Sequence, residues 1–148
     1  MCIVCKKNPE ELVKYKYLEI YNCNKIISIP KYLTNLIQLE ISNCKNFTTI
    51  PNEITNIGHL YINKCPLFIV LPKGLQSLQQ LYISNCIKFK RVLNYFPLLH
   101  TIIIEDCYCL IDICKSFKFL EYLNIKNCPM YVSKNIHLDN TYEIINFL

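Results

Sequence analysis

The chain has 148 residues, of which 52% are hydrophobic and 18% are charged, and its formal net charge is +5. This composition excludes a disordered polar tail, and the length suits one hydrophobic core. Polar residues interrupt every apolar run, so no membrane-spanning helix is predicted, and the first residues do not resemble a signal peptide. We therefore expect one folded domain, residues 1–148, in the reducing cytoplasm, with no membrane partner.

The N-terminal segment, residues 1–14, contains Cys2 and Cys5 in a Cys-x-x-Cys spacing, which occurs in zinc and redox sites. However, Cys2 precedes Cys23 by the same interval that separates Leu12 from Leu33, and this interval recurs along the rest of the chain. We interpret the segment as a degenerate partial repeat whose cysteines belong to core columns. A zinc site would need two further ligands at close spacing, so we expect no metal ion and no cofactor.

Residues 15–140 form six 21-residue units that align without an insertion, and residues 141–148 end the chain. Three columns recur in every unit: Cys23, Cys44, Cys65, Cys86, Cys107 and Cys128; Leu18, Leu39, Leu60, Leu81, Ile102 and Leu123; and Ile20, Ile41, Ile62, Ile83, Ile104 and Ile125. A fixed period of this length indicates a repeat protein, in which stacked units share one core.

The spacing within a unit decides between a solenoid and a coiled coil, since a unit of this length also equals three heptads. Pro30, Pro51 and Pro72 would fall inside a helix, at a cost of about 3 kcal/mol each. The apolar spacing also changes from a step of two to steps of three or four, which no single helix satisfies. The step of two predicts a short strand at about residues 17–21 and at the equivalent place in each later unit.

The unit from Leu36 to Asn56, Leu-x-x-Leu-x-Ile-x-Asn-Cys-x-x-Phe-x-x-Ile-Pro, resembles a leucine-rich repeat of the short, cysteine-containing kind. It is similar to repeats of plant intracellular resistance receptors and F-box adaptors, and such short arrays also resemble those of large DNA viruses of amoebae. The resemblance implies an α/β-class leucine-rich repeat solenoid: a curved right-handed array with a parallel β-sheet on its concave face, extended or 3-10 return segments and little regular helix. It also implies protein binding. Leu93, Cys114 and Asn135 depart from the pattern, since they replace the Pro of earlier units.

We expect the cysteine column to be structural. A thiol is readily buried and donates weakly to a carbonyl, which suits the bend where the chain leaves the strand. Parallel strands lie about 4.8 Å apart with equivalent side chains pointing the same way, whereas a disulfide needs Cβ atoms roughly 3.8 Å apart. The column is therefore predicted to contain buried thiols.

The strand register predicts an outward stripe of aromatic and apolar side chains, formed by Tyr61, Tyr82 and Ile103. Three polar residues are predicted beside it: His59, Gln80 and Glu105. Tyrosines and isolated apolar residues in a polar surround are typical of interface cores. These six residues are our candidate partner-binding site in a non-catalytic protein that is a monomer or self-associates weakly end to end.

Other functions have weaker support. No catalytic residue is predicted, because His59 would have Gln38 and Gln80 as neighbours, and neither activates a nucleophile. Nucleic acid is not an expected partner, because the basic run at 88–91 falls in a return segment and the outward columns contain acidic residues such as Glu40. Two alternatives stay open: a self-associating structural protein with neither end capped, and a substrate-recognition subunit of a ubiquitin-ligase-type assembly.

Overall fold

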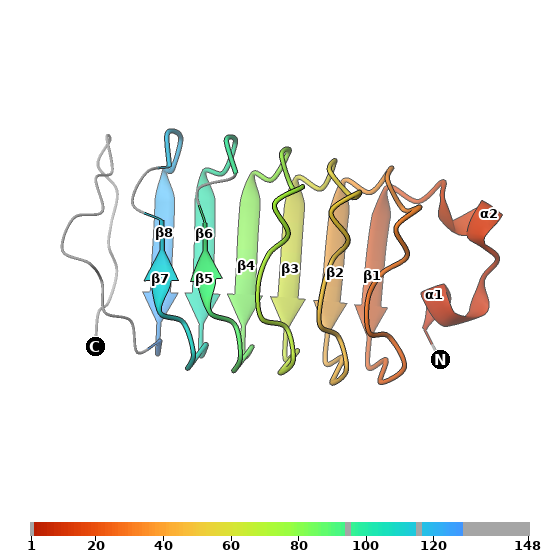
Figure 1. The fold of residues 1–148 in the computed structure, drawn as a ribbon, viewed down its shortest axis with the longest axis horizontal. Helices are drawn as coiled ribbons and strands as arrows, with labels where there is room; N and C mark the ends of the chain where they lie inside the picture. The colour runs from red at the N-terminus through yellow and green to blue at the C-terminus, as the bar shows by residue number, and fades with distance from the viewer. Residues whose placement is uncertain (1, 94–95, 115–116, 129–148) are drawn as a thin grey trace.

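The computed structural model describes residues 2–93, 96–114 and 117–128, which form a parallel solenoid (Figure 1). A six-stranded parallel sheet has the order β1-β2-β3-β4-β6-β8. Its strands are β1 (Tyr17–Tyr21), β2 (Gln38–Ser42), β3 (His59–Asn63), β4 (Gln80–Ser84), β6 (Thr101–Glu105) and β8 (Tyr122–Lys126). The predicted strand positions are confirmed. The return segment of the sixth unit, with His137, and residues 141–148 lie outside the described residues.

The strand pairing keeps each residue beside its equivalent in the next unit, as Leu39 pairs with Leu60 and Tyr61 pairs with Tyr82. Side chains alternate between the two faces of a strand. The Leu and Ile columns are therefore buried, while most of the side chains between them are partly or fully exposed. The inward and outward columns expected from the sequence are confirmed.

The core lies between this sheet and the return segments. Phe47, Phe68 and Phe89 stack in one column, with centroid separations of 5.7 and 5.8 Å between successive rings. All three side chains are fully buried. Each repeat thus covers the aromatic ring of its neighbour, and a single unit could not bury this ring alone.

The return segments lie on the opposite side of the solenoid from the main sheet (Figure 1). Two of them contain the short strands β5 (Arg91–Val92) and β7 (Asp112–Ile113), which pair in parallel. Isolated turns occur where 3-10 segments were expected, for example where the Leu33 amide donates to the Pro30 carbonyl at 3.2 Å. The described return segments contain no regular helix, and no described helix is long and apolar enough to span a membrane.

Each main strand is followed by a residue with left-handed backbone geometry, directly before the column cysteine. These residues are Asn22, Asn43, Lys64, Asn85, Asp106 and Asn127, with φ between 50° and 54°. Asn and Asp tolerate this conformation better than other residues with a Cβ atom. The bend was predicted at the cysteine, whereas the backbone turns one residue earlier.

The N-terminal segment forms two one-turn helices, α1 (Ile3–Lys6) and α2 (Pro9–Leu12), beside β1 (Figure 1). Asn8 caps α2, since its side chain accepts a hydrogen bond from the Glu10 amide, and Pro9 suits the first helical position. Leu12 is fully buried, as expected from its column, but Cys5 is exposed. The expectation that both cysteines occupy core columns is therefore wrong, because the chain coils into a helix here. The expectation that neither end is capped is wrong at this end.

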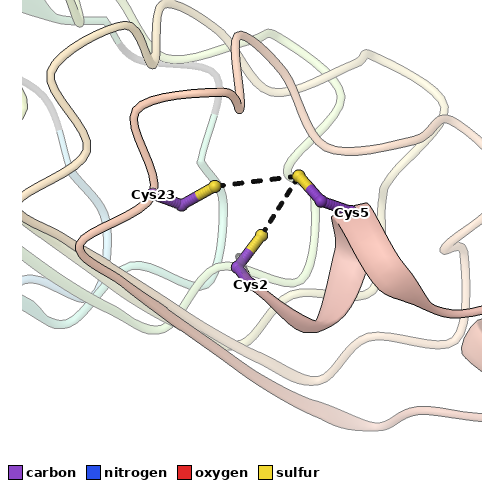
Figure 2. Close-up of side chains that lie close together, drawn as sticks. All are labelled: Cys2, Cys5 and Cys23. Atoms are coloured by element: carbon purple, nitrogen blue, oxygen red, sulfur yellow. Dashed lines mark hydrogen bonds between the residues drawn. The ribbon is translucent and has the colours of Figure 1, made fainter.

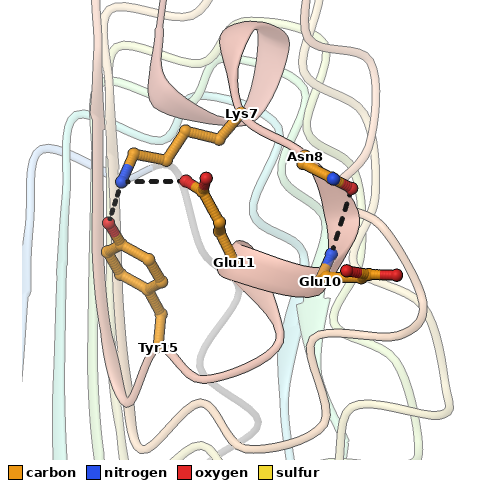
Figure 3. A network of polar contacts seen from close by, with 5 residues as sticks. All are labelled: Lys7, Asn8, Glu10, Glu11 and Tyr15. Atoms are coloured by element: carbon orange, nitrogen blue, oxygen red, sulfur yellow. Dashed lines mark hydrogen bonds and ion pairs between the residues drawn. The ribbon is translucent and has the colours of Figure 1, made fainter.

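A small polar network links these helices (Figure 3). The Lys7 ammonium donates to the Tyr15 hydroxyl at 2.9 Å and lies 3.4 Å from a Glu11 carboxylate oxygen. Both groups of the ion pair are solvent-exposed, so the pair contributes little stability. The attachment of α2 to the array rests mainly on Leu12.

Candidate functional site

The six candidate partner-binding residues lie together on the outward side of β3, β4 and β6, a surface that we call the sheet face: His59, Tyr61, Gln80, Tyr82, Ile103 and Glu105. Tyr61 pairs with Tyr82, and Tyr82 pairs with Ile103. The two tyrosine rings are tilted, with centroids 6.2 Å apart. All six side chains are partly exposed, so the structure contains the predicted stripe in a form that a partner can reach.

Hydrogen bonds fix the polar ends of the sheet face. The Tyr61 hydroxyl donates to Gln80 Oε1 at 3.4 Å, and His59 Nδ1 lies 3.0 Å from the same oxygen. The Tyr82 hydroxyl donates to Glu105 Oε2 at 3.2 Å. Burial raises the pKa of Tyr82, and the nearby Glu105 carboxylate raises it further, so the phenol stays a neutral donor. The stripe is pre-organised, and binding would cost less side-chain entropy.

A ladder of polar side chains beside the stripe was missed by the sequence analysis. Ser84 Oγ donates to Asn63 Oδ1 at 2.9 Å, and Asn63 Nδ2 donates to Ser42 Oγ at 3.3 Å. Ser84 is buried, although it lies in an outward column. The column is visible in the sequence, but its hydrogen bonds depend on side-chain rotamers, which the register alone does not give.

The β1 end of the same sheet is aromatic and acidic. Tyr17 and Tyr21 are 64% and 46% exposed. Hydrogen bonding to the Glu40 carboxylate, burial and the nearby Glu19 raise the pKa of Tyr21 to about 12. The basic side chains Lys88, Lys90 and Arg91 are exposed instead in the return segment around β5. The acidic and basic surfaces are thus on different sides of the solenoid.

The cysteine column is structural, as predicted. Five column thiols each donate to a carbonyl in the main strand of the previous repeat unit, at 3.7 to 3.9 Å; for example, Cys44 follows β2 and donates to Ile20 of β1. The five are Cys44, Cys65, Cys86, Cys107 and Cys128. The six column cysteines, Cys23, Cys44, Cys65, Cys86, Cys107 and Cys128, form no disulfide. Burial raises the pKa of Cys65 to about 11 and that of Cys86 to about 12, so these thiols stay protonated and continue to donate.

One group of side chains in the described residues could hold a metal ion. The sulfur atoms of Cys2, Cys5 and Cys23 all lie within 4.8 Å of one another (Figure 2). Cys23 comes from the bend after β1, and the other two come from α1 and its N-cap position. The repeat period aligns Cys2 with Cys23, but it did not predict that Cys5 would lie beside them.

A comparison with protein-family models finds a match to the Leucine Rich Repeat family at residues 35–57, which include β2 and its return segment. Comparisons with curated proteins and with solved structures give no significant match. The matched unit has the same period and the same strand as the units around it. The family match at residues 35–57 and the solenoid-like parallel sheet fit a leucine-rich repeat protein.

Proposed function

We propose that the chain is a non-catalytic module that binds a partner protein through the sheet face. Leucine-rich repeats generally mediate protein–protein interactions, and their solenoid is typically a scaffold without catalytic activity. The observation that carries the proposal is the stripe of Tyr61, Tyr82 and Ile103, which is partly exposed and whose two hydroxyls already have partners. Central aromatic anchors of this kind supply most of the binding energy at interfaces.

The size and charge of the surface support a protein partner. Six strands at about 4.8 Å span roughly 25 Å, enough for an interface of about 800 Å² on this side. Glu40 and Glu105 lie in the outward columns, and their carboxylates would repel nucleic-acid phosphates. A partner with hydrogen-bond donors or basic groups beside an apolar centre fits this surface. A column of buried thiols without disulfides suits a reducing compartment, so we place the interaction in the cytoplasm.

The test is quantitative affinity capture from the native cell with three triple variants. The first replaces Tyr61, Tyr82 and Ile103 with Ala. The matched control replaces three exposed isoleucines of the return side with Ala: Ile27, Ile69 and Ile111. The third reverses the charge of the basic run: Lys88, Lys90 and Arg91.

We expect the sheet-face variant to lose the partner while both other variants retain it. Tyr82→Ala alone should weaken binding by about 2 kcal/mol or more, because this ring lies at the centre of the stripe. Binding that survives the sheet-face variant but is lost with the isoleucine variant would move the interface to the return side. Loss with the charge-reversed variant alone, together with a steep dependence on salt, would indicate nucleic acid.

A further inference from the structure

The cysteine column ends differently at its first member. Each later column thiol donates to a carbonyl in the main strand of the previous repeat unit. Cys23 follows β1, the first strand of the sheet, so it has no earlier main strand to donate to. Its sulfur instead lies 3.7 Å from Cys5 Sγ, and Cys5 Sγ lies 3.5 Å from Cys2 Sγ (Figure 2). Two thiols from the N-terminal segment thus lie beside Cys23, the first thiol of the column.

The sulfur separations match a single tetrahedral ion. Zn–S bonds of about 2.3 Å place the sulfurs of a tetrahedral thiolate site roughly 3.8 Å apart. The observed 3.5 and 3.7 Å are close to this distance, and the third separation is within 4.8 Å. The sulfurs would therefore move little to surround an ion. Since Cys5 is exposed, a water molecule could reach the fourth position.

The local structure explains how three thiols come together. Cys2 and Cys5 stand at positions i and i+3 across the one-turn helix α1, a spacing that puts two side chains on one face of a helix. The buried Cys23 then completes the group from the bend after β1.

The protonation of the cluster is compatible with a cation. Burial alone would raise the pKa of Cys23, but hydrogen bonds from Cys2 and from the Lys25 and Ile26 amides lower it to about 7. Burial and the hydrogen bonds with Cys2 and Cys23 raise the pKa of Cys5 to about 12. Because thiols bind a metal ion as thiolates, a bound cation would favour the deprotonation of all three cysteines.

We propose that Cys2, Cys5 and Cys23 form a three-thiolate site for one thiophilic cation, with Zn²⁺ as the test ion, which fastens α1 to the first repeat. Thiolate ligands select zinc and copper(I) over hard cations such as Mg²⁺. Fastening matters here because α1 contains no fully buried residue. The ion would replace weak contacts by coordinate bonds between the cap and the bend after β1.

The experiment is a Zn²⁺ titration of the reduced, metal-free full chain against a chromophoric chelator. Co²⁺ replaces Zn²⁺ in a parallel titration to report thiolate ligation by its absorption. The site variants are Cys2→Ser and Cys5→Ser, and the matched control is Cys109→Ser, which alters another exposed cysteine. Circular dichroism of the metal-free variants checks that the solenoid is retained, which we expect because Cys5 is not part of the buried core.

We expect one ion per chain in the unaltered protein and in Cys109→Ser. Loss of one thiolate ligand should weaken Zn²⁺ binding at least about 100-fold. Even the loss of a residue that only hydrogen-bonds a metal ligand can lower metal affinity by about that factor. Hydrogen exchange of the amides in residues 3–7 should slow when Zn²⁺ binds. Equal affinity in Cys5→Ser and the unaltered chain would overturn the proposal, as would the absence of stoichiometric binding. Binding of Mg²⁺ in place of Zn²⁺ would also overturn it.

Discussion

Replacement of Cys65 by Asp tests the buried thiol column at its centre. Cys65 is fully buried, and its thiol donates to the carbonyls of Ile41 and Asn63 at 3.8 and 3.4 Å. An ionised Asp would direct negative charge at these two oxygens and could not donate to them. Burial raises a carboxyl pKa by as much as about 3 to 5 units, and a shift of about 3 units corresponds to about 4 kcal/mol. We expect Cys65→Asp to lower the free energy of unfolding by about that amount near neutral pH.

The sign of the pH dependence follows from the same shift. The folded-state pKa of the new Asp lies above its unfolded value of about 3.9, so the folded state binds the proton more tightly. The penalty should therefore be small below about pH 4 and should grow as the pH rises through the folded-state pKa. Urea unfolding followed by circular dichroism at several pH values measures it.

Two further variants make this prediction specific. Cys109→Asp introduces the same group at an exposed cysteine and should change stability by less than about 0.5 kcal/mol. Cys65→Asn should be tolerated better than Cys65→Asp, because a neutral amide can donate to the carbonyls. Equal losses of stability in Cys65→Asp and Cys109→Asp, or a Cys65→Asp penalty that does not change with pH, would refute the buried column.

Three further predictions concern the rest of the array. Phe68→Ala should lower the free energy of unfolding in urea by about 3 to 5 kcal/mol, because it opens the buried ring stack. Phe119→Ala removes a half-exposed ring and should lower it much less, and similar losses in the two variants would contradict the described core. Lys64→Asn should stabilise the protein by up to about 1 kcal/mol in the same assay, since Lys64 has a φ of 50° that Asn tolerates better, and a loss of stability would argue against this backbone geometry. In a native thiol-labelling time course, Cys109 should react quickly and Cys65 slowly, and the reverse order would exclude the assigned burial.

The main sheet could be predicted because an unbroken period fixes the register. Since equivalent residues stand beside one another in a parallel array, the spacing of Leu39 and Leu60 or of Tyr61 and Tyr82 is enough to align the strands. The same alignment of the strands puts the six sheet-face residues on one surface. It could not give their hydrogen bonds, which depend on side-chain rotamers such as those that bring the Tyr82 hydroxyl to Glu105.

The N-terminal cap was missed because its helices are too short to show helical periodicity. The start signal of α2 was nevertheless present: Asn8 at the cap, Pro9 at the first helical position and two glutamates in the first turn. Assigning the segment to a further repeat hid this signal. The same assignment aligned Cys2 with Cys23, one repeat period away, but put Cys5 in a different core column, so the three thiols were not expected to meet.

Photo-crosslinking from two matched positions tests the proposed function most directly. A photoreactive residue replaces either Ile103 on the sheet face or Ile111, which is 53% exposed in the return segment. Both variants are illuminated in the native cell, and the crosslinked partner is identified by mass spectrometry. We predict an abundant protein crosslink from position 103 that is lost when Tyr82→Ala is added, and little from position 111. Crosslinks to the same protein from position 111, with none from position 103, would contradict partner binding by the sheet face.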